Sequence, residues 1–212
     1  MNAIRYTALG TAVLLALAVP ASPARAAAAD DSPKVKITGL TFNGSGCTRG
    51  DDPLVHLENG GRRLTVEFSG FHTQAGLVPR DNAPRVWVPR ANRNCQVGFT
   101  LAYSPGWTFA LTGVDGIGFA DVDQAASTRR HDTYYFAGMT QTDGFTTVTD
   151  GPYTGTYHHA NTAAAPNWSE CGKARGLNVN SRIQVDASKA DRASLSEVTM
   201  DAMIVNLGWK RC

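Results

Sequence analysis

The chain has 212 residues, and its 20 lysines and arginines against 18 acidic residues give a formal net charge of +2. This balance gives no electrostatic reason to expect nucleic acid or an anionic membrane as a partner. The length suits one domain with a sizeable core, because no low-complexity linker divides the chain.

The N-terminus has the pattern of an export signal. Arg5 supplies the positive charge, a short apolar run follows over residues 8–19, and Ala24-Arg25-Ala26 offers small residues for cleavage. The apolar run is too short to span a bilayer. We therefore expect residues 1–26 to be a signal peptide that is removed on export.

The mature chain is expected to begin with a disordered stretch over residues 27–34 and to continue as one domain over residues 35–212. Loss of the leader's two arginines leaves 18 basic and 18 acidic residues, so the mature chain is close to neutral. No later segment is long and apolar enough to span a bilayer. These features predict a secreted, extracellular protein with no membrane or nucleic-acid partner.

The mature chain contains short runs in which apolar and polar residues alternate, which is typical of half-buried β-strands. Such runs, together with β-prone stretches rich in aromatic residues or threonine and one stretch that is apolar on both faces, predict strands at residues 35–42, 64–68, 97–103, 107–112, 117–122, 133–136, 145–149, 177–185 and 198–209. No ten-residue window shows a helical stripe of apolar residues. The sequence therefore predicts an all-β fold, an antiparallel two-sheet β-sandwich that forms a single domain.

Glycine and proline mark the reversals between these strands. Ser104-Pro105-Gly106 fits a type II turn, so the strands on either side are expected to pair as a β-hairpin whose entrance Cys95 ties down. Asn59-Gly60-Gly61 and Asp115-Gly116 are expected to be further turns. Three prolines in the stretch 77–94 indicate a surface loop or a sheet edge, because proline cannot donate to a ladder.

In two of the predicted strands, the pattern of residues also predicts which faces are buried. In the strand 177–185, Ser181 falls on the inward face between apolar residues. The strand 198–209 is apolar on both faces around Met203-Ile204-Val205, which predicts a central or well-covered strand.

All four cysteines lie in the mature chain, and an exported protein favours disulfides. Four cysteines allow three pairings, and we favour Cys47–Cys95 with Cys171–Cys212, because each pair brackets one half of the chain. Each bridge would close a loop of about 40 to 50 residues, which the chain-entropy model values at about 4 kcal/mol. A structural zinc site fits poorly, because no two cysteines have CxxC spacing.

Residues that carry chemistry are sparse. The sequence has no nucleophile elbow, no HExxH and no phosphate-binding loop. His158-His159 is the most conspicuous histidine pair, but adjacent residues on a strand point to opposite faces and do not readily share a metal. Asp121 and Asp123 would share one face, which makes them weak calcium candidates without the remaining ligand positions.

Aromatic residues are the candidates for ligand binding. Several tyrosines and tryptophans would offer a sugar-stacking platform if they lay on one exposed sheet face, whereas core packing is the alternative. A tryptophan among the arginines of the stretch 80–93 is of the type favoured in interfaces, and a solvated loop is the alternative. The candidate ligand-binding residues are Trp87, Tyr134, Tyr153 and Trp168.

Seven motifs occur in an order that resembles a known family. They are Asn43-Gly44-Ser45-Gly46-Cys47, Asn92-Arg93-Asn94-Cys95-Gln96, Thr133-Tyr134-Tyr135-Phe136-Ala137-Gly138, Gly151-Pro152-Tyr153-Thr154-Gly155, Cys171-Gly172, Leu177-Asn178-Val179-Asn180-Ser181 and Trp209-Lys210-Arg211-Cys212. Together they resemble the secreted proteins grouped as domain of unknown function 4360, over residues 35–212. The resemblance implies export, a compact β domain and two disulfides. It carries over no catalytic residues.

The sequence favours a secreted, non-enzymatic module that binds a ligand outside the cell, with polysaccharide or cell-wall material as the expected ligand. This hypothesis requires the candidate aromatic side chains to be exposed. One alternative is a protein-binding module, such as an inhibitor of extracellular hydrolases, that uses residues 77–93. Another is a hydrolase with an unfamiliar site around Asp121, Asp123 and a histidine. We expect a monomer without a cofactor.

Overall fold

The computed structural model describes residues 32–48 and 53–212, which form thirteen β-strands and one short 3-10 helix, η1 (Asn59–Gly61). The predicted signal peptide and residues 27–31 of the predicted disordered start lie outside the described residues. Within the described ranges, no helix is long and apolar enough to cross a membrane.

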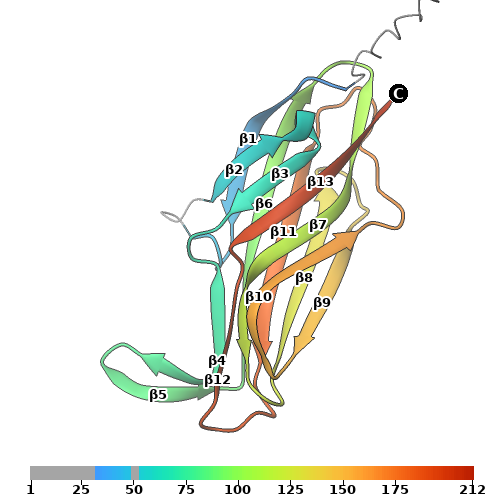
Figure 1. The fold of residues 1–212 in the computed structure, drawn as a ribbon. Coiled ribbons are helices and arrows are strands. Elements are labelled where there is room, and N and C mark those ends of the chain that lie inside the picture. Colours follow the sequence, from blue (N-terminus) through green and yellow to red (C-terminus); the bar gives the residue numbers. More distant parts are fainter. Residues whose placement is uncertain (1–31, 49–52) are drawn as a thin grey trace, which may run out of the picture. The chain divides into compact units, whose positions relative to one another are not determined.

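The strands form two antiparallel sheets (Figure 1). The five-stranded sheet consists, in spatial order, of β1 (Val35–Asn43), β6 (Arg90–Tyr103), β11 (Gly176–Asp186), β8 (Ser127–Phe136) and β9 (Asp143–Asp150). The eight-stranded sheet consists of β2 (Leu54–Glu58), β3 (Arg63–Glu67), β13 (Ala202–Arg211), β7 (Trp107–Val122), β12 (Leu195–Thr199), β4 (His72–Arg80) and β5 (Ala83–Val88), with β10 (Tyr153–Thr162) on the other side of β7. The predicted all-β, two-sheet architecture is confirmed.

The hydrophobic core lies between the two sheets and contains every second residue of the central strands. In β11 the apolar inward residues are at most 1% exposed, and Ser181 occupies the inward position among them, as predicted. Phe109 of β7 meets Phe136 of β8 edge to face, with ring centroids 5.1 Å apart. Burial of side chains of this size stabilises the fold by about 1.5–3 kcal/mol each.

Two disulfides join Cys47 to Cys95 and Cys171 to Cys212, which is the pairing favoured from the sequence. The Cys47–Cys95 bridge is part of the core, where it attaches the segment after β1 to β6. The Cys171–Cys212 bridge is exposed and ties the last residue of the chain to the segment that precedes β11.

The hairpin predicted around Ser104-Pro105-Gly106 is wrong. β6 pairs with β1 and β11, whereas β7 pairs with β13, β12 and β10 in the other sheet. The turn therefore carries the chain from one sheet to the other. A period of two indicates which face of a strand is buried but not which strand lies beside it.

The turn predicted at Asp115-Gly116 is also wrong, because β7 continues through both residues. Gly116 lies against the buried side chain of Arg130, and a Cβ on this glycine would come within 2.0 Å of Arg130 Nη1. The glycine therefore serves close packing rather than chain reversal.

The proline-containing stretch 77–94 is not an irregular loop. It contains the end of β4, all of β5 and the start of β6. β5 is the outermost strand of its sheet, so the sheet-edge alternative is the correct one (Figure 1).

The predicted terminal strand 198–209 is divided into β12 and β13. Met200 and Asp201 interrupt it, and their backbone N–H groups donate instead to Phe71 O and Ile117 O, each at 2.8 Å. β13 pairs with β3 on one side and β7 on the other, so its predicted central position is confirmed.

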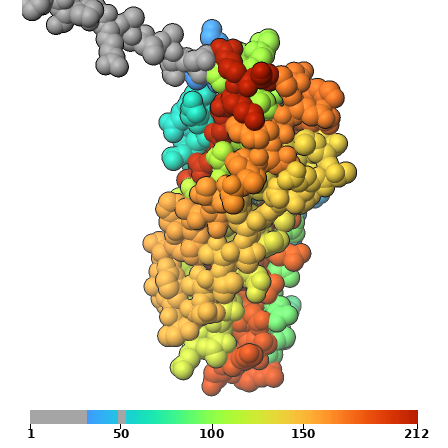
Figure 2. Space-filling view, turned by 90° about the vertical axis from the view of Figure 1, so that its right-hand side faces the viewer, coloured from blue at the N-terminus to red at the C-terminus, as the bar shows by residue number. Residues whose placement is uncertain are grey.

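Strands β9 and β10 lie side by side on one surface although they belong to different sheets (Figure 2). Their link consists of side-chain hydrogen bonds, from Asn161 Nδ2 to Thr147 Oγ1 at 3.3 Å and between His159 Nε2 and Thr149 Oγ1 at 3.4 Å. These bonds connect the two sheets along this side of the sandwich.

Candidate functional site

The candidate aromatic residues do not share a surface. Tyr134 is only 2% exposed and stacks on Phe145 inside the sandwich, so its expected exposure is wrong. The prediction assigned the wrong one of two neighbouring tyrosines to the outer face of the strand. Tyr135 points outward, and its hydroxyl accepts a hydrogen bond from Gln96 Nε2 at 3.4 Å. A shift of one residue exchanges the two faces of a strand.

The other three candidates are partly buried and lie apart. Trp87 of β5 packs under Arg192, whose Cζ is 4.6 Å from the ring centroid. Trp168 bridges to Ala110 of β7 and lies under Lys210, and Tyr153 of β10 donates its hydroxyl to Thr156 O. Among the described residues, no ring contact or pocket joins two of the four candidates, so they do not form one stacking platform.

The weak calcium candidates, Asp121 and Asp123, are exposed. Asp121 accepts a hydrogen bond from Thr154, and Asp123 Oδ1 accepts one from the N–H of Gln124. Within residues 32–48 and 53–212, no group of three or more His, Cys, Asp or Glu side chains is arranged to hold a metal ion.

The histidine pair of β10 points to opposite faces, as predicted. His158 is exposed, with its Nε2 3.8 Å from Asp115 Oδ2. His159 points inward and stacks on Tyr157 with ring centroids 4.5 Å apart. Burial, reinforced by the nearby Arg130, lowers the pKa of His159, and its Nδ1 is buried without a hydrogen-bond partner.

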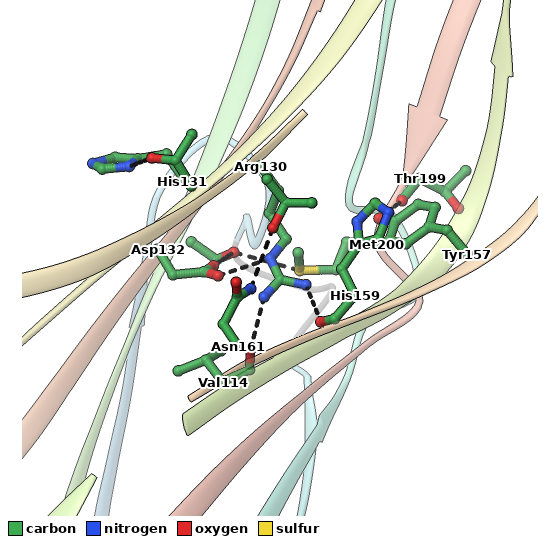
Figure 3. A network of polar contacts seen from close by, with 12 residues as sticks. Val114, Arg130, His131, Asp132, Tyr157, His159, Asn161, Thr199 and Met200 are labelled. Carbon is green, nitrogen blue, oxygen red and sulfur yellow. Dashed lines mark hydrogen bonds and ion pairs between the residues drawn. The ribbon is translucent and has the colours of Figure 1, made fainter. Parts of the chain in front are cut away.

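A buried polar network occupies the middle of the sandwich (Figure 3). Arg130 and Asp132 of β8 both point inward, and Arg130 Nε donates to Asp132 Oδ2 at 2.7 Å. Arg130 also donates to Val114 O at 2.9 Å and to His159 O at 3.0 Å, which are carbonyls of the other sheet. Ser181 Oγ donates to Asp132 Oδ1 at 2.5 Å.

This network is closed to solvent. The side chains of Arg130 and Asp132 are 3% and 1% exposed, and none of the pockets among the described residues is lined by either of them. Burial raises the pKa of Asp132, while Arg130 and the hydrogen bond from Ser181 oppose that shift. A charged pair held in this way links the two sheets and fixes their relative position, but it offers no place for a substrate.

An accessible site lies on the outer face of the five-stranded sheet, where a groove of about 450 Å³ crosses four strands. We call it the arginine groove, and its residues are Arg90 of β6, Arg182, Gln184 and Asp186 of β11, Arg129 and His131 of β8, and Thr146 of β9. Three arginines against one aspartate give the groove a net positive charge of two, with histidine neutral.

Strand register brings these residues together. His131 lies opposite Arg182 on one side and Thr146 on the other, and its Nδ1 is 2.8 Å from Thr146 Oγ1. Arg129 lies opposite Gln184, and Arg90 lies opposite Asp186. Arg90 donates through Nε and Nη2 to Asp186 Oδ2, at 3.0 and 2.5 Å.

The groove continues into a lattice of amide and hydroxyl groups on the same face. Asn94 lies opposite Arg182, and its Nδ2 donates to Asn180 Oδ1 at 3.1 Å. The Gln96–Tyr135 hydrogen bond lies next to it, since Gln96 is the register partner of Asn180. The face thus presents hydrogen-bonded amide and hydroxyl groups beside the arginine side chains of the groove, all on one regular sheet.

Sequence reasoning missed the arginine groove. Arg129, His131, Arg182 and Gln184 are single outward residues between inward core positions, and each looks like an ordinary solvated strand residue. The available signal was that polar residues occupy every second position of the strands now identified as β8 and β11. These outward polar residues can be recognised as one site only when the register of non-consecutive strands is known.

The structure thus defines a class: a disulfide-linked, all-β sandwich domain with a polar, positively charged outer sheet face. The family model described as Domain of unknown function (DUF4360) matches residues 33–212, and the chain belongs to this family. The chain is also similar to an "Uncharacterized secreted protein" of Arthroderma benhamiae, with 30% identity over 193 residues that cover 87% of this chain and 74% of the relative. These findings agree with the family resemblance noted in the sequence, and the protein is secreted.

Proposed function

We propose that the protein is an extracellular, non-enzymatic module that binds a polysaccharide chain along the outer face of its five-stranded sheet. The candidate aromatic residues no longer support polysaccharide binding, because Tyr134 is buried and the four residues form no common platform. The observation that carries the proposal is instead the arginine groove, because it joins charged and uncharged hydrogen-bonding groups on one open surface. Sugar hydroxyls both donate and accept, so a ligand rich in them suits a face of amides and hydroxyls.

The geometry favours binding over hydrolysis. Glycoside hydrolysis commonly uses two carboxyl groups on either side of the scissile bond. Asp186 is the one carboxylate among the groove residues, and hydrogen bonds from Ser188 and, less strongly, from Arg90 lower its pKa to about 2. A carboxylate with such a pKa does not serve as a general acid near neutral pH.

Trp87 and the β4–β5 hairpin support a second candidate function, the binding of another secreted protein. β5 is an edge strand with Arg85 and Val86 exposed, and exposed edges can pair with a strand of a partner. Replacement of Arg85 and Val86 by Ala should then abolish capture of a protein partner; unchanged capture would exclude this function.

A co-sedimentation experiment tests the polysaccharide proposal. The mature protein is mixed with insoluble cellulose, chitin or peptidoglycan, and depletion from the supernatant and released sugar are measured together. We expect depletion without release. Release of sugar would contradict a non-enzymatic role. Absence of depletion with every insoluble polysaccharide, together with absence of retardation by soluble ones in affinity gel electrophoresis, would contradict binding.

A variant locates the site. Gln184→Trp places a bulky group in the arginine groove without a change of charge, and we expect it to weaken binding. Thr156→Trp is the matched control, because Thr156 is exposed on β10 of the other sheet. Equal loss in both variants, or no loss in either, would show that the ligand does not bind in the groove.

A further inference from the structure

We infer that the ligand is an acidic polysaccharide, a chain of uronic acids whose carboxylates pair with Arg129 and Arg182. This inference rests on the proposed polysaccharide binding. The inference adds the chemistry of the ligand and the two residues that recognise it.

The three arginines of the groove differ in one respect. Arg90 faces a carboxylate across the strands, since Asp186 is its register partner and accepts its hydrogen bonds. Arg129 faces the neutral Gln184, and Arg182 faces His131 and Asn94. Among the described residues, neither the Arg129 nor the Arg182 side chain makes a hydrogen bond or an ion pair.

Arg90 is paired with a carboxylate of the protein, Asp186, whereas Arg129 and Arg182 have no carboxylate partner among the described residues. A guanidinium group presents a planar fork of donors that matches a carboxylate, and such charge-assisted bonds are stronger than neutral ones. The protein therefore supplies a carboxylate to Arg90, and the guanidinium groups of Arg129 and Arg182 can donate hydrogen bonds to carboxylates of a ligand.

The placement of the two free arginines suits a repeating ligand. They lie on neighbouring strands, because Arg182 is opposite His131, two residues from Arg129. Diagonal neighbours of this kind have Cα atoms roughly 7–8 Å apart, and arginine side chains extend further. A polyuronate carries a carboxylate on each sugar, so one chain can engage both arginines at once, which raises the overall affinity.

The experiment compares two forms of one polymer. Affinity gel electrophoresis measures binding to polygalacturonate and to its fully methyl-esterified form, which has the same sugar backbone without charge. We expect the ester to bind about tenfold more weakly, and binding of the acidic form to fall as NaCl rises from low to high concentration, because salt screens exposed charges. Alginate serves as a second polyuronate.

Two variants and a control assign the residues. Arg129→Gln and Arg182→Gln are each expected to weaken polygalacturonate binding about fivefold, and the double variant about twentyfold. Arg62→Gln is the matched control, because Arg62 is an exposed arginine of the other sheet, directly before β3. Thermal unfolding confirms that each variant is folded.

The outcomes separate this inference from the proposed function. Equal binding of the acid and its ester, binding only to neutral polysaccharides, or full binding by the double variant would overturn the inference and leave polysaccharide binding intact. Tighter binding to poly(glycerol phosphate) than to either polyuronate would overturn the assignment of carboxylates. Failure to bind any polysaccharide would overturn both.

Discussion

Gly116 of β7 provides the space that the side chain of Arg130 occupies between the two sheets. A Cβ at position 116 would lie 2.0 Å from Arg130 Nη1 and 2.7 Å from Cζ. The same guanidinium donates to Val114 O, two residues away along β7. The glycine and the arginine thus form one unit, which lets a long cation fit into a packed interior beside its carboxylate.

The first prediction concerns this unit. Gly116→Ala should destabilise the protein by about 2–4 kcal/mol, because the added methyl group forces a buried, hydrogen-bonded guanidinium to move. Gly176→Ala is the matched control, since it lies in β11 and its added Cβ would meet nothing closer than 3.7 Å. Urea unfolding measures both. Similar midpoints for the two variants would show that the Arg130 side chain adapts freely.

Much of the fold follows from the sequence. Alternation of apolar and polar residues correctly identifies the strands around Leu64, Phe99 and Val179, since one face of each is in the core. The same patterns do not specify sheet neighbours. The segments before and after Ser104-Pro105-Gly106 have the pattern of a hairpin, but the chain crosses between sheets there, because non-local partners in both sheets pair with β6 and β7.

The candidate site follows less from the sequence. Asp115-Gly116 is a frequent turn dipeptide. Only the structure shows why a glycine is needed inside this strand, because the side chain of Arg130 from β8 packs against it. Tyr134 and Tyr135 are chemically alike, and only the register of β8 decides which one is exposed. The arginine groove depends on four strands whose order in the sheet differs from their order in the chain.

The second prediction concerns the buried ion pair. Arg130→Met and Asp132→Leu should each destabilise the protein by about 3–5 kcal/mol, because each leaves an opposite charge buried without its partner. The double variant should cost clearly less than the sum of the two, since no buried charge remains. Chemical denaturation of all four proteins gives the coupling free energy. Additive costs would mean that the two side chains contribute independently.

The third prediction concerns the disulfides. In the chain-entropy model the two bridges are nearly equal, at about 4 kcal/mol each, because they span 48 and 41 residues. Replacement of Cys47 and Cys95 by Ala also leaves space in the core, whereas Cys171 and Cys212 are exposed. The first double variant should therefore be the less stable one. Thermal unfolding of both checks the order, and the reverse order would contradict the argument.

The fourth prediction concerns His159. Burial and the nearby Arg130 lower its pKa from 6.5, so the folded state resists protonation of this ring while the unfolded state does not. The unfolded state therefore binds more protons below about pH 6.5, and stability falls as the pH drops from there towards the lowered pKa. Well above pH 6.5 the ring is neutral in both states and has no such effect.

His159→Gln removes this titration, and the backbone carbonyl that accepts from Arg130 Nη1 is kept. We expect the free energy of unfolding of the variant to change less between pH 7 and pH 5 than that of the parent protein. His56→Gln is the matched control, because His56 is an exposed histidine on β2 and does not contribute to the lowered pKa of His159. If the His159→Gln variant and the parent show the same pH dependence, the ring is not a source of acid sensitivity, and the Tyr157–His159 stack contributes through packing alone.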